Sequence, residues 1–424
     1  MYNVHTIPAN QPFLDTLIEG LLEWDRERLA DTLLLLPSRR TCLAAREVFL
    51  RVSGGVPLLL PRLVPIGEPD EPELLIDPAL ELTLAPAISQ VRRQLLLTRL
   101  VQAKEPGMPL EQAVRLAAEL ARFLDELHNE EVGLAGLDTL VPADLADHWQ
   151  QTQVFLQLLA QAWPPILAAE GCLDPSLRRR LLVDALSMSW QHVAPSHPVV
   201  AAGVTGSIPC IARLLARIAR LPNGTVVLPA LDRTIDSAGW DAVGPTHPQY
   251  GLKRLLDLME IDRSAVRSWP DGGPILPHPR IELWNHVLRP AMTTEDWRRR
   301  TPLPAEATAG LEVAVAADLA GEALQIALRL RHALESQGKR AVLITPSRVL
   351  GRRVATELLR WGIRVDDSAG VPLDQSPPGT FLLLTAHLVA GGASPVTLLS
   401  ALKHPLASGG IGQREFRRFA RALE

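Results

Sequence analysis

Residues 33–49, LLLLPSRRTCLAAREVF, decide the fold class of this chain. The first four are leucines, an apolar run that is too short for a helix and fits a strand buried on both faces. Pro37 and Ser38 end this run, and the residues from Thr41 to Val52 have the composition of a helix. A buried strand that leads through a short turn into a helix is the repeating unit of a parallel α/β sheet.

The same pattern occurs on both sides of this stretch. Upstream, a short strand-like run leads through the loop 8–12 into a helix, and downstream further short apolar runs end at proline or glycine. We therefore predict a parallel sheet that contains both residues 33–36 and residues 198–203. The predicted elements are strands over 2–7, 57–66, 198–203 and 225–228, and helices over 13–24 and 208–221.

The hydrophobic period changes in the middle of this pattern. Apolar residues recur at helical intervals from about residue 88 to residue 189, and strand-like runs then resume. An all-helical subdomain is therefore predicted as an insertion into the α/β lobe, with Asp174 as an N-cap and Pro175 at the first helical position. The apolar positions at helical spacing include Leu145, Trp149, Leu156 and Leu159.

A second α/β pattern follows a linker rich in charge and proline. Residues 236–279 have little periodicity apart from a helix predicted over 249–259, and they are left unassigned. Beyond the linker, strands are predicted over 311–316, 340–345 and 362–365, and helices over 321–336 and 346–359. The predicted organisation is a first lobe over 1–87 and 195–300, an inserted helical subdomain over 88–194, a linker over 301–310 and a partial second lobe over 311–424.

Composition bounds the class of protein. The 424 residues are 47% hydrophobic and 21% charged, which is typical of a folded globular chain and excludes disorder. The net charge of −4 provides no general positive field, so any polyanion site must be a local patch. Cys42, Cys172 and Cys210 have no zinc-like spacing and are predicted to be buried free thiols. Without a signal peptide or an apolar span, a cytoplasmic protein with no membrane association is expected.

The sequence contains no phosphate-binding loop of the Walker A type. That loop needs a lysine followed by serine or threonine, and the chain has lysine only at positions 104, 253, 339 and 403, none of them so followed. At the expected place, after the first strand, stand Pro8, Ala9, Asn10, Gln11 and Pro12, which offer no glycine and no cation. ATP binding and hydrolysis are therefore not expected.

Other candidate chemistry is sparse. Asp232, Asp236 and Asp241 do not converge by spacing alone, so Asp232 is predicted to form a strand-end turn; Asp366 and Asp367 are predicted to lie in a solvated loop. No metal site is predicted. The segment 203–209, GVTGSIP, places glycines and hydroxyls between a strand and a helix N-terminus, where anions bind readily. A capping turn explains this segment equally well.

Four stretches of the sequence together carry a resemblance to a known family. They are 33–49 (LLLLPSRRTCLAAREVF), 198–232, 247–256 (HPQYGLKRLL) and 340–380. These stretches resemble the B subunit of AddAB-type helicase-nucleases, in particular the alphaproteobacterial branch. The resemblance spans essentially the whole chain, and residues 205–209 (TGSIP) and 361–373 are distinctive of that family.

The resemblance implies a RecBCD-like machine that processes double-strand breaks. In it this subunit has a superfamily-1 helicase-like, P-loop NTPase-like lobe without a working motor, paired with an AddA-type motor subunit. Thr345 stands where an active helicase carries a phosphate-sensing arginine. The family's nuclease part, with its iron–sulfur cluster and Mg²⁺, has no counterpart here, so the chain is expected to be an N-terminal fragment that ends inside the second lobe, with no cofactor of its own.

Single-stranded DNA is predicted to cross the open ends of the strands. All the predicted contact residues directly follow predicted strands, where open α/β sheets place their ligand crevice. Hydroxyls and guanidinium groups suit phosphate oxygens, although Ser38 and Ser347 fit helix N-caps as well. The alternatives are an ATP-driven translocase and, less favoured, an α/β metabolic enzyme, for which no catalytic constellation is present. The predicted contact residues are Ser38, Arg39, Arg40, Thr205, Ser207, Ser347 and Arg348.

Overall fold

The computed structural model describes residues 2–66, 84–133, 161–270, 278–299 and 302–423. Contacts between residues divide the chain into two units, Met1–Gly310 and Leu311–Glu424, which we describe separately. The division falls where the predicted linker 301–310 ends.

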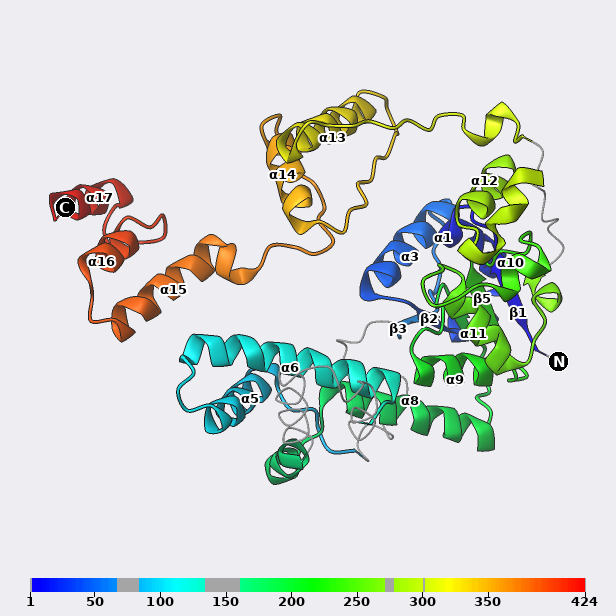
Figure 1. Ribbon diagram of the computed structural model, residues 1–424, viewed down its shortest axis with the longest axis horizontal. Coiled ribbons are helices and arrows are strands. Elements are labelled where there is room, and N and C mark those ends of the chain that lie inside the picture. The colour runs from blue at the N-terminus through cyan, green and yellow to red at the C-terminus, as the bar shows by residue number, and fades with distance from the viewer. Residues whose placement is uncertain (1, 67–83, 134–160, 271–277, 300–301, 424) are drawn as a thin grey trace. The chain divides into compact units, whose positions relative to one another are not determined.

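Unit 1 is built on one six-stranded parallel sheet (Figure 1). Its strand order is β3-β2-β4-β5-β1-β6, and every neighbouring pair is parallel. The prediction of an α/β fold is confirmed. The strands β1 to β5 overlap the five strands predicted for this unit, whereas β6 was not predicted. The strands are β1 (Val4–Ile7), β2 (Leu33–Leu36), β3 (Arg62–Pro65), β4 (Val199–Ala202), β5 (Gly224–Pro229) and β6 (Arg267–Ser268).

Helices cover both faces of this sheet, which explains the uninterrupted leucines of β2. Leu34 and Leu36 pack under α1 (Phe13–Leu22), α2 (Arg26–Asp31) and α3 (Arg39–Val52). Leu33 and Leu35 pack on the opposite face, against α8 (Pro175–His192), α9 (Pro209–Ile218) and α11 (Tyr250–Met259). Successive strand residues point to opposite faces, so a strand covered on both sides needs an apolar residue at every position.

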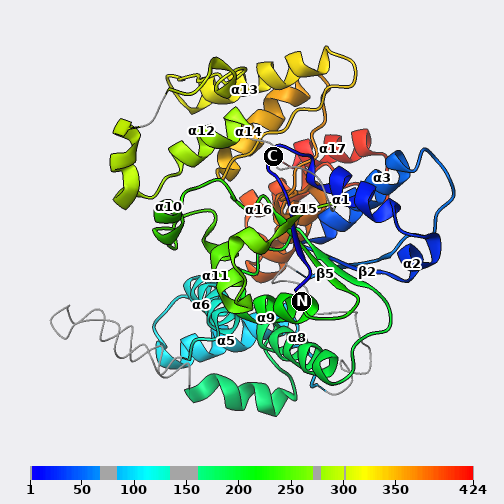
Figure 2. The ribbon, with the colours of Figure 1, turned by 90° about the vertical axis from the view of Figure 1, so that its right-hand side faces the viewer.

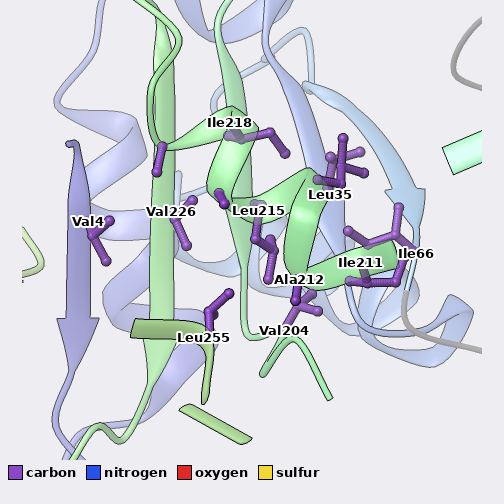
Figure 3. Close-up of a cluster of buried hydrophobic side chains, with 14 of the residues drawn as sticks. Val4, Leu35, Ile66, Val204, Ile211, Ala212, Leu215, Ile218, Val226 and Leu255 are labelled. Carbon is purple, nitrogen blue, oxygen red and sulfur yellow. The ribbon is translucent and has the colours of Figure 1, made fainter. Parts of the chain in front are cut away.

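The figures show this layering. Figure 2 shows α1 and α3 on one side of the strands and α8 and α9 on the other. Figure 3 shows Leu35 and Val226 of the sheet facing Ile211 and Leu215 of α9. Burying each such side chain stabilises the fold by about 1.5–3 kcal/mol.

The sheet continues across the helical insertion. β2 pairs directly with β4, with Leu33 opposite Val199, as the prediction of a single sheet requires. Between β3 and β4 the chain forms α5 (Gln90–Lys104), α6 (Leu110–Glu130) and α8. Helix α8 also packs on the sheet, so it belongs to both the insertion and the lobe. The predicted helical positions Leu145, Trp149, Leu156 and Leu159 lie outside the described residues.

A buried ionic network holds the helical block together. Asp174 stands at the N-cap position of α8, as predicted, but its carboxylate makes no capping bond. Instead it lies 2.8 Å from Arg93 Nε and 3.3 Å from His128 Nε2, and it accepts a 2.8 Å hydrogen bond from Trp163 Nε1. Although burial opposes ionisation, the bond to His128 and the charge of Arg93 hold the pKa of Asp174 below its usual value. Arg93 also binds Asp125.

Polar bonds organise the segment after β5, which sequence periodicity left unassigned. Arg289 binds both Asp236 and Asp296 and is almost fully buried. Lys253 Nζ donates to three carbonyl groups at and just after the end of α10 (Ser237–Asp241), including a 2.8 Å bond to Asp241 O. The elements here are α10 (Ser237–Asp241), α12 (Pro279–Val287) and 3-10 turns over Arg263–Ala265, Ala291–Arg299 and Ala305–Ala307.

Unit 2 is helical in its described residues, so the strands predicted over 311–316, 340–345 and 362–365 are wrong there. The first two segments join no ladder, and Val313 and Ile344 are 94% and 92% exposed. A strand forms only where a neighbouring chain accepts its hydrogen bonds. The elements are α13 (Leu319–Leu334), α14 (Arg348–Leu359), a 3-10 turn (Leu373–Gln375), α15 (Pro377–Ala390), α16 (Pro395–Leu402) and α17 (Gln413–Ala422).

Candidate nucleic-acid interface

The carboxyl ends of all six strands lie at one edge of the sheet, because every pair is parallel. Open α/β sheets bind their ligands at this edge. Four loops leave it next to one another in the order of the strands: those that follow β2, β4, β5 and β1. Five of the seven predicted contact residues lie on the first two of these loops.

The loop after β2 carries the basic side chains. Ser38 is the N-cap of α3, where its Oγ accepts a 3.1 Å hydrogen bond from Thr41 N, so the capping interpretation is confirmed for this residue. Arg39 and Arg40 follow as the first two residues of α3, and both are exposed. The first turn contains no acidic residue. Two exposed guanidinium groups therefore stand at the start of α3, next to the carboxyl end of β2.

The loop after β4 lies directly beside it. Gly203 has φ +76°, and a Cβ atom at this position would lie 3.3 Å from Pro37 Cγ, so the two loops are close neighbours. Thr205 and Ser207 are exposed beyond this contact, and neither hydroxyl bonds to a described residue. The N-cap of α9 is Ile208, with no side-chain hydrogen bond. The capping interpretation is therefore wrong for the side chains of this loop.

The loop after β1 forms a turn and does not have the features of a phosphate-binding loop. Gln11 N donates a 3.0 Å hydrogen bond to Pro8 O, and Pro12 precedes α1 without a side-chain cap. Pro8 and Ala9 instead line a pocket of about 230 Å³, whose walls are mostly apolar. This is below the roughly 300–1,000 Å³ of pockets that hold drug-sized ligands. The pocket is also lined by Thr6, residues 230–235 and 247–249, and Ile281, Trp284, Asn285 and Leu288.

Polar groups beside this pocket form hydrogen bonds within and between the loops that line it. Asp232 Oδ1 accepts hydrogen bonds of 2.8 Å from Thr234 N and 3.0 Å from Ile235 N, which confirms the predicted strand-end turn. Gln249 donates to Ala230 O and accepts from Asp232 N. The pocket has one arginine in its lining, Arg233, and no lysine. Its wall from α12 was missed by sequence reasoning, because residues 279–287 have no clear period.

The two candidates in unit 2 are engaged in local contacts. Ser347 Oγ caps α14 by accepting a 3.2 Å hydrogen bond from Leu350 N. Arg348 binds both carboxylate oxygens of Asp367, at 2.9 and 3.0 Å, and this pair lowers the pKa of Asp367 to about 2. Asp366 and Asp367 lie in a loop, as predicted, and Asp366 is exposed; Asp367 is partly exposed and in addition pairs with Arg348. Arg348 would have to leave Asp367 before it could bind DNA through both guanidinium edges.

The described residues offer little evidence for a metal site or a reactive cysteine. No group of three or more His, Cys, Asp or Glu side chains is arranged to hold a metal ion there. Asp236 caps α10 and binds Arg289, separately from the turn of Asp232. All three cysteines are free, but only Cys42 and Cys210 are buried, whereas Cys172 is partly exposed.

No helix in the described ranges has the length and apolar character needed to cross a membrane. Models of known protein families give no match to this chain, and a comparison with curated proteins likewise gives none.

Proposed function

We propose that this chain is a DNA-binding, motor-inactive scaffold of helicase-like fold, and that it serves a RecBCD-like helicase-nuclease in double-strand break repair. One observation carries the proposal. Two arginines of the first turn of α3, Arg39 and Arg40, and two hydroxyl residues of the loop after β4, Thr205 and Ser207, are exposed at the carboxyl ends of adjacent strands. The finer assignment to superfamily 1 and to an AddAB-type B subunit rests on the resemblance of the sequence.

The chemistry of these loops suits a phosphate backbone. Guanidinium groups bind phosphate oxygens through two N–H donors, and hydroxyls add neutral donors that position the strand. Helix α3 begins at the same place, and a helix N-terminus attracts anions.

The inactivity of the motor is supported by the loop after β1. A nucleoside triphosphate needs several backbone donors and a lysine-like charge beside the strand. Here Pro8 and Pro12 have no N–H groups, and the neighbouring pocket is lined mainly by apolar atoms. We therefore propose that a partner subunit of the AddA type supplies the motor, and that this chain holds a single strand of DNA for it. The nuclease chemistry, with Mg²⁺ and an iron–sulfur cluster, is proposed to lie outside this chain.

The test is a titration of the full chain with a labelled single-stranded oligonucleotide, followed by fluorescence anisotropy over a series of salt concentrations. Each phosphate contact on a single strand contributes about −0.7 to the slope of log K against log salt. Arg39→Ala with Arg40→Ala is expected to make that slope shallower by about 1.4 and to weaken binding at low salt several-fold.

A matched control removes two exposed arginines elsewhere. Arg115 and Arg122 on α6 are 76% and 67% exposed and pair only with glutamates of their own helix. Arg115→Ala with Arg122→Ala should leave the slope unchanged. If the control pair weakens binding as much as the Arg39 and Arg40 pair, the site is not at the strand ends. Micromolar, magnesium-dependent ATP binding by the chain would favour an active translocase instead.

A further inference from the structure

Helix α17 carries the densest run of positive charge in unit 2. Its ten residues, Gln413–Ala422, include four arginines and a single acid, Glu415. At 3.6 residues per turn, positions i, i+3, i+4 and i+7 fall within an arc of about 100°. The arginines at these positions are Arg414, Arg417, Arg418 and Arg421, and all four are exposed.

The opposite side of α17 is already packed, and this fixes the direction of the arginines. Ala420 is buried and Phe416 is partly buried. A Cβ atom at Gly409 would lie 2.7 Å from the Phe416 ring, so the turn before the helix sits against that ring. Gln413 also donates a hydrogen bond to Pro405 O. The apolar side of α17 therefore faces its own unit, and the arginine face points outward.

This face has no counter-charge within the described residues. The exposed arginines of α6 pair with glutamates one turn away, as Arg115 does with Glu111. In contrast, none of the four arginines of α17 forms a hydrogen bond or ion pair with a described residue. Like charges one turn apart destabilise a helix, so a cluster of four in a chain of net charge −4 is explained best by an external polyanion.

We propose that the arginine face of α17 binds the phosphate backbone of a nucleic-acid strand. The proposal rests on the proposed function and adds a second contact region to it. The rise of about 1.5 Å per residue spreads the arginines over about 10 Å, the length of about three phosphates at B-form spacing.

An anionic membrane fits this helix less well. Helices that lie on bilayers insert a wide apolar face beneath their basic residues. In α17 that side is occupied by the contact of Phe416 with Gly409, and little apart from Phe419 is left to insert. Phosphate recognition through guanidinium groups needs no such insertion.

The test compares two pairs of substitutions with the same spacing and the same loss of charge. Arg414→Ala with Arg421→Ala removes arginines seven residues apart from α17, and Arg115→Ala with Arg122→Ala does so from α6. Full chains are titrated with the labelled single-stranded oligonucleotide over a salt series. The α17 pair is expected to make the salt slope shallower by about 1.4, and the α6 pair to leave it unchanged.

The outcomes separate this proposal from the proposed function. If the α17 pair behaves like the α6 pair while Arg39→Ala with Arg40→Ala weakens binding, the helix proposal is wrong and the strand-end site stands. If only the α17 substitutions weaken binding, the helix proposal stands and the strand-end site is wrong. A chain that binds no oligonucleotide overturns both. Loss of binding to phosphatidylserine vesicles, with oligonucleotide binding unchanged, would overturn the helix proposal in favour of a membrane surface.

Discussion

Asp174→Asn is expected to destabilise the helical block strongly. The substitution keeps the size of the side chain but removes the charge that faces Arg93, at 2.8 Å, in a site where the carboxylate is 1% exposed. Removing one partner of a buried ion pair costs about 3–5 kcal/mol, because the other charge stays buried without compensation. Arg93 retains Asp125, whose side chain is 30% exposed, so we expect the lower end, about 3 kcal/mol.

Urea unfolding of the wild type and the variant, followed by circular dichroism, measures the difference. The pH dependence has a defined sign. Because the folded-state pKa of Asp174 is lowered, its stabilisation is complete above the unfolded-state pKa and is lost as pH falls through the folded-state value. The difference in the free energy of unfolding between wild type and variant should therefore shrink as the solution is made acidic. Glu111→Gln, on a fully exposed pair, serves as the control and should change stability by about 0.5 kcal/mol or less. A variant as stable as the wild type at neutral pH would refute the reasoning.

Two further predictions concern thiols and the β4 loop. In the native chain Cys172 should react with a thiol reagent well before Cys42 and Cys210, because those two are buried and burial raises the pKa of Cys210 to about 11. Mass spectrometry of alkylated peptides measures the order of labelling. Early labelling of Cys210 would contradict the prediction. Gly203→Ala should lower the free energy of unfolding by about 1–2 kcal/mol, because alanine is strained at φ +76°. An unchanged midpoint of thermal unfolding would contradict this prediction.

The sheet was predictable from sequence where strand residues are apolar at every position. Leu33–Leu36 required burial on both faces, and β2 has those bounds. In contrast, β6 consists of Arg267 and Ser268 alone, and two polar residues produce no period. The segments 311–316 and 340–345 have the composition of strands but lack a paired neighbour in unit 2, which composition cannot reveal.

The candidate site was predictable only as positions along the chain. The rule that ligands bind at strand ends selected Arg39 and Thr205, which are exposed beyond the adjacent strands β2 and β4; their role in DNA binding stays a prediction. Sequence could not show that Gly203 lies close to Pro37, because the helical insertion lies between them in the chain. Nor could it show that Arg348 pairs with Asp367, since the pairing depends on how the loop after α14 returns.

The most direct test of the central claim is hydrogen–deuterium exchange of the full chain with and without saturating single-stranded DNA. Exposed loop amides exchange rapidly unless a ligand covers them. The account predicts slower exchange over residues 37–41 and 203–208, at the ends of β2 and β4, with no change over residues 8–12 and 230–235. Protection confined to residues 8–12 and 230–235, or absent from both strand-end loops while DNA is bound, would contradict it.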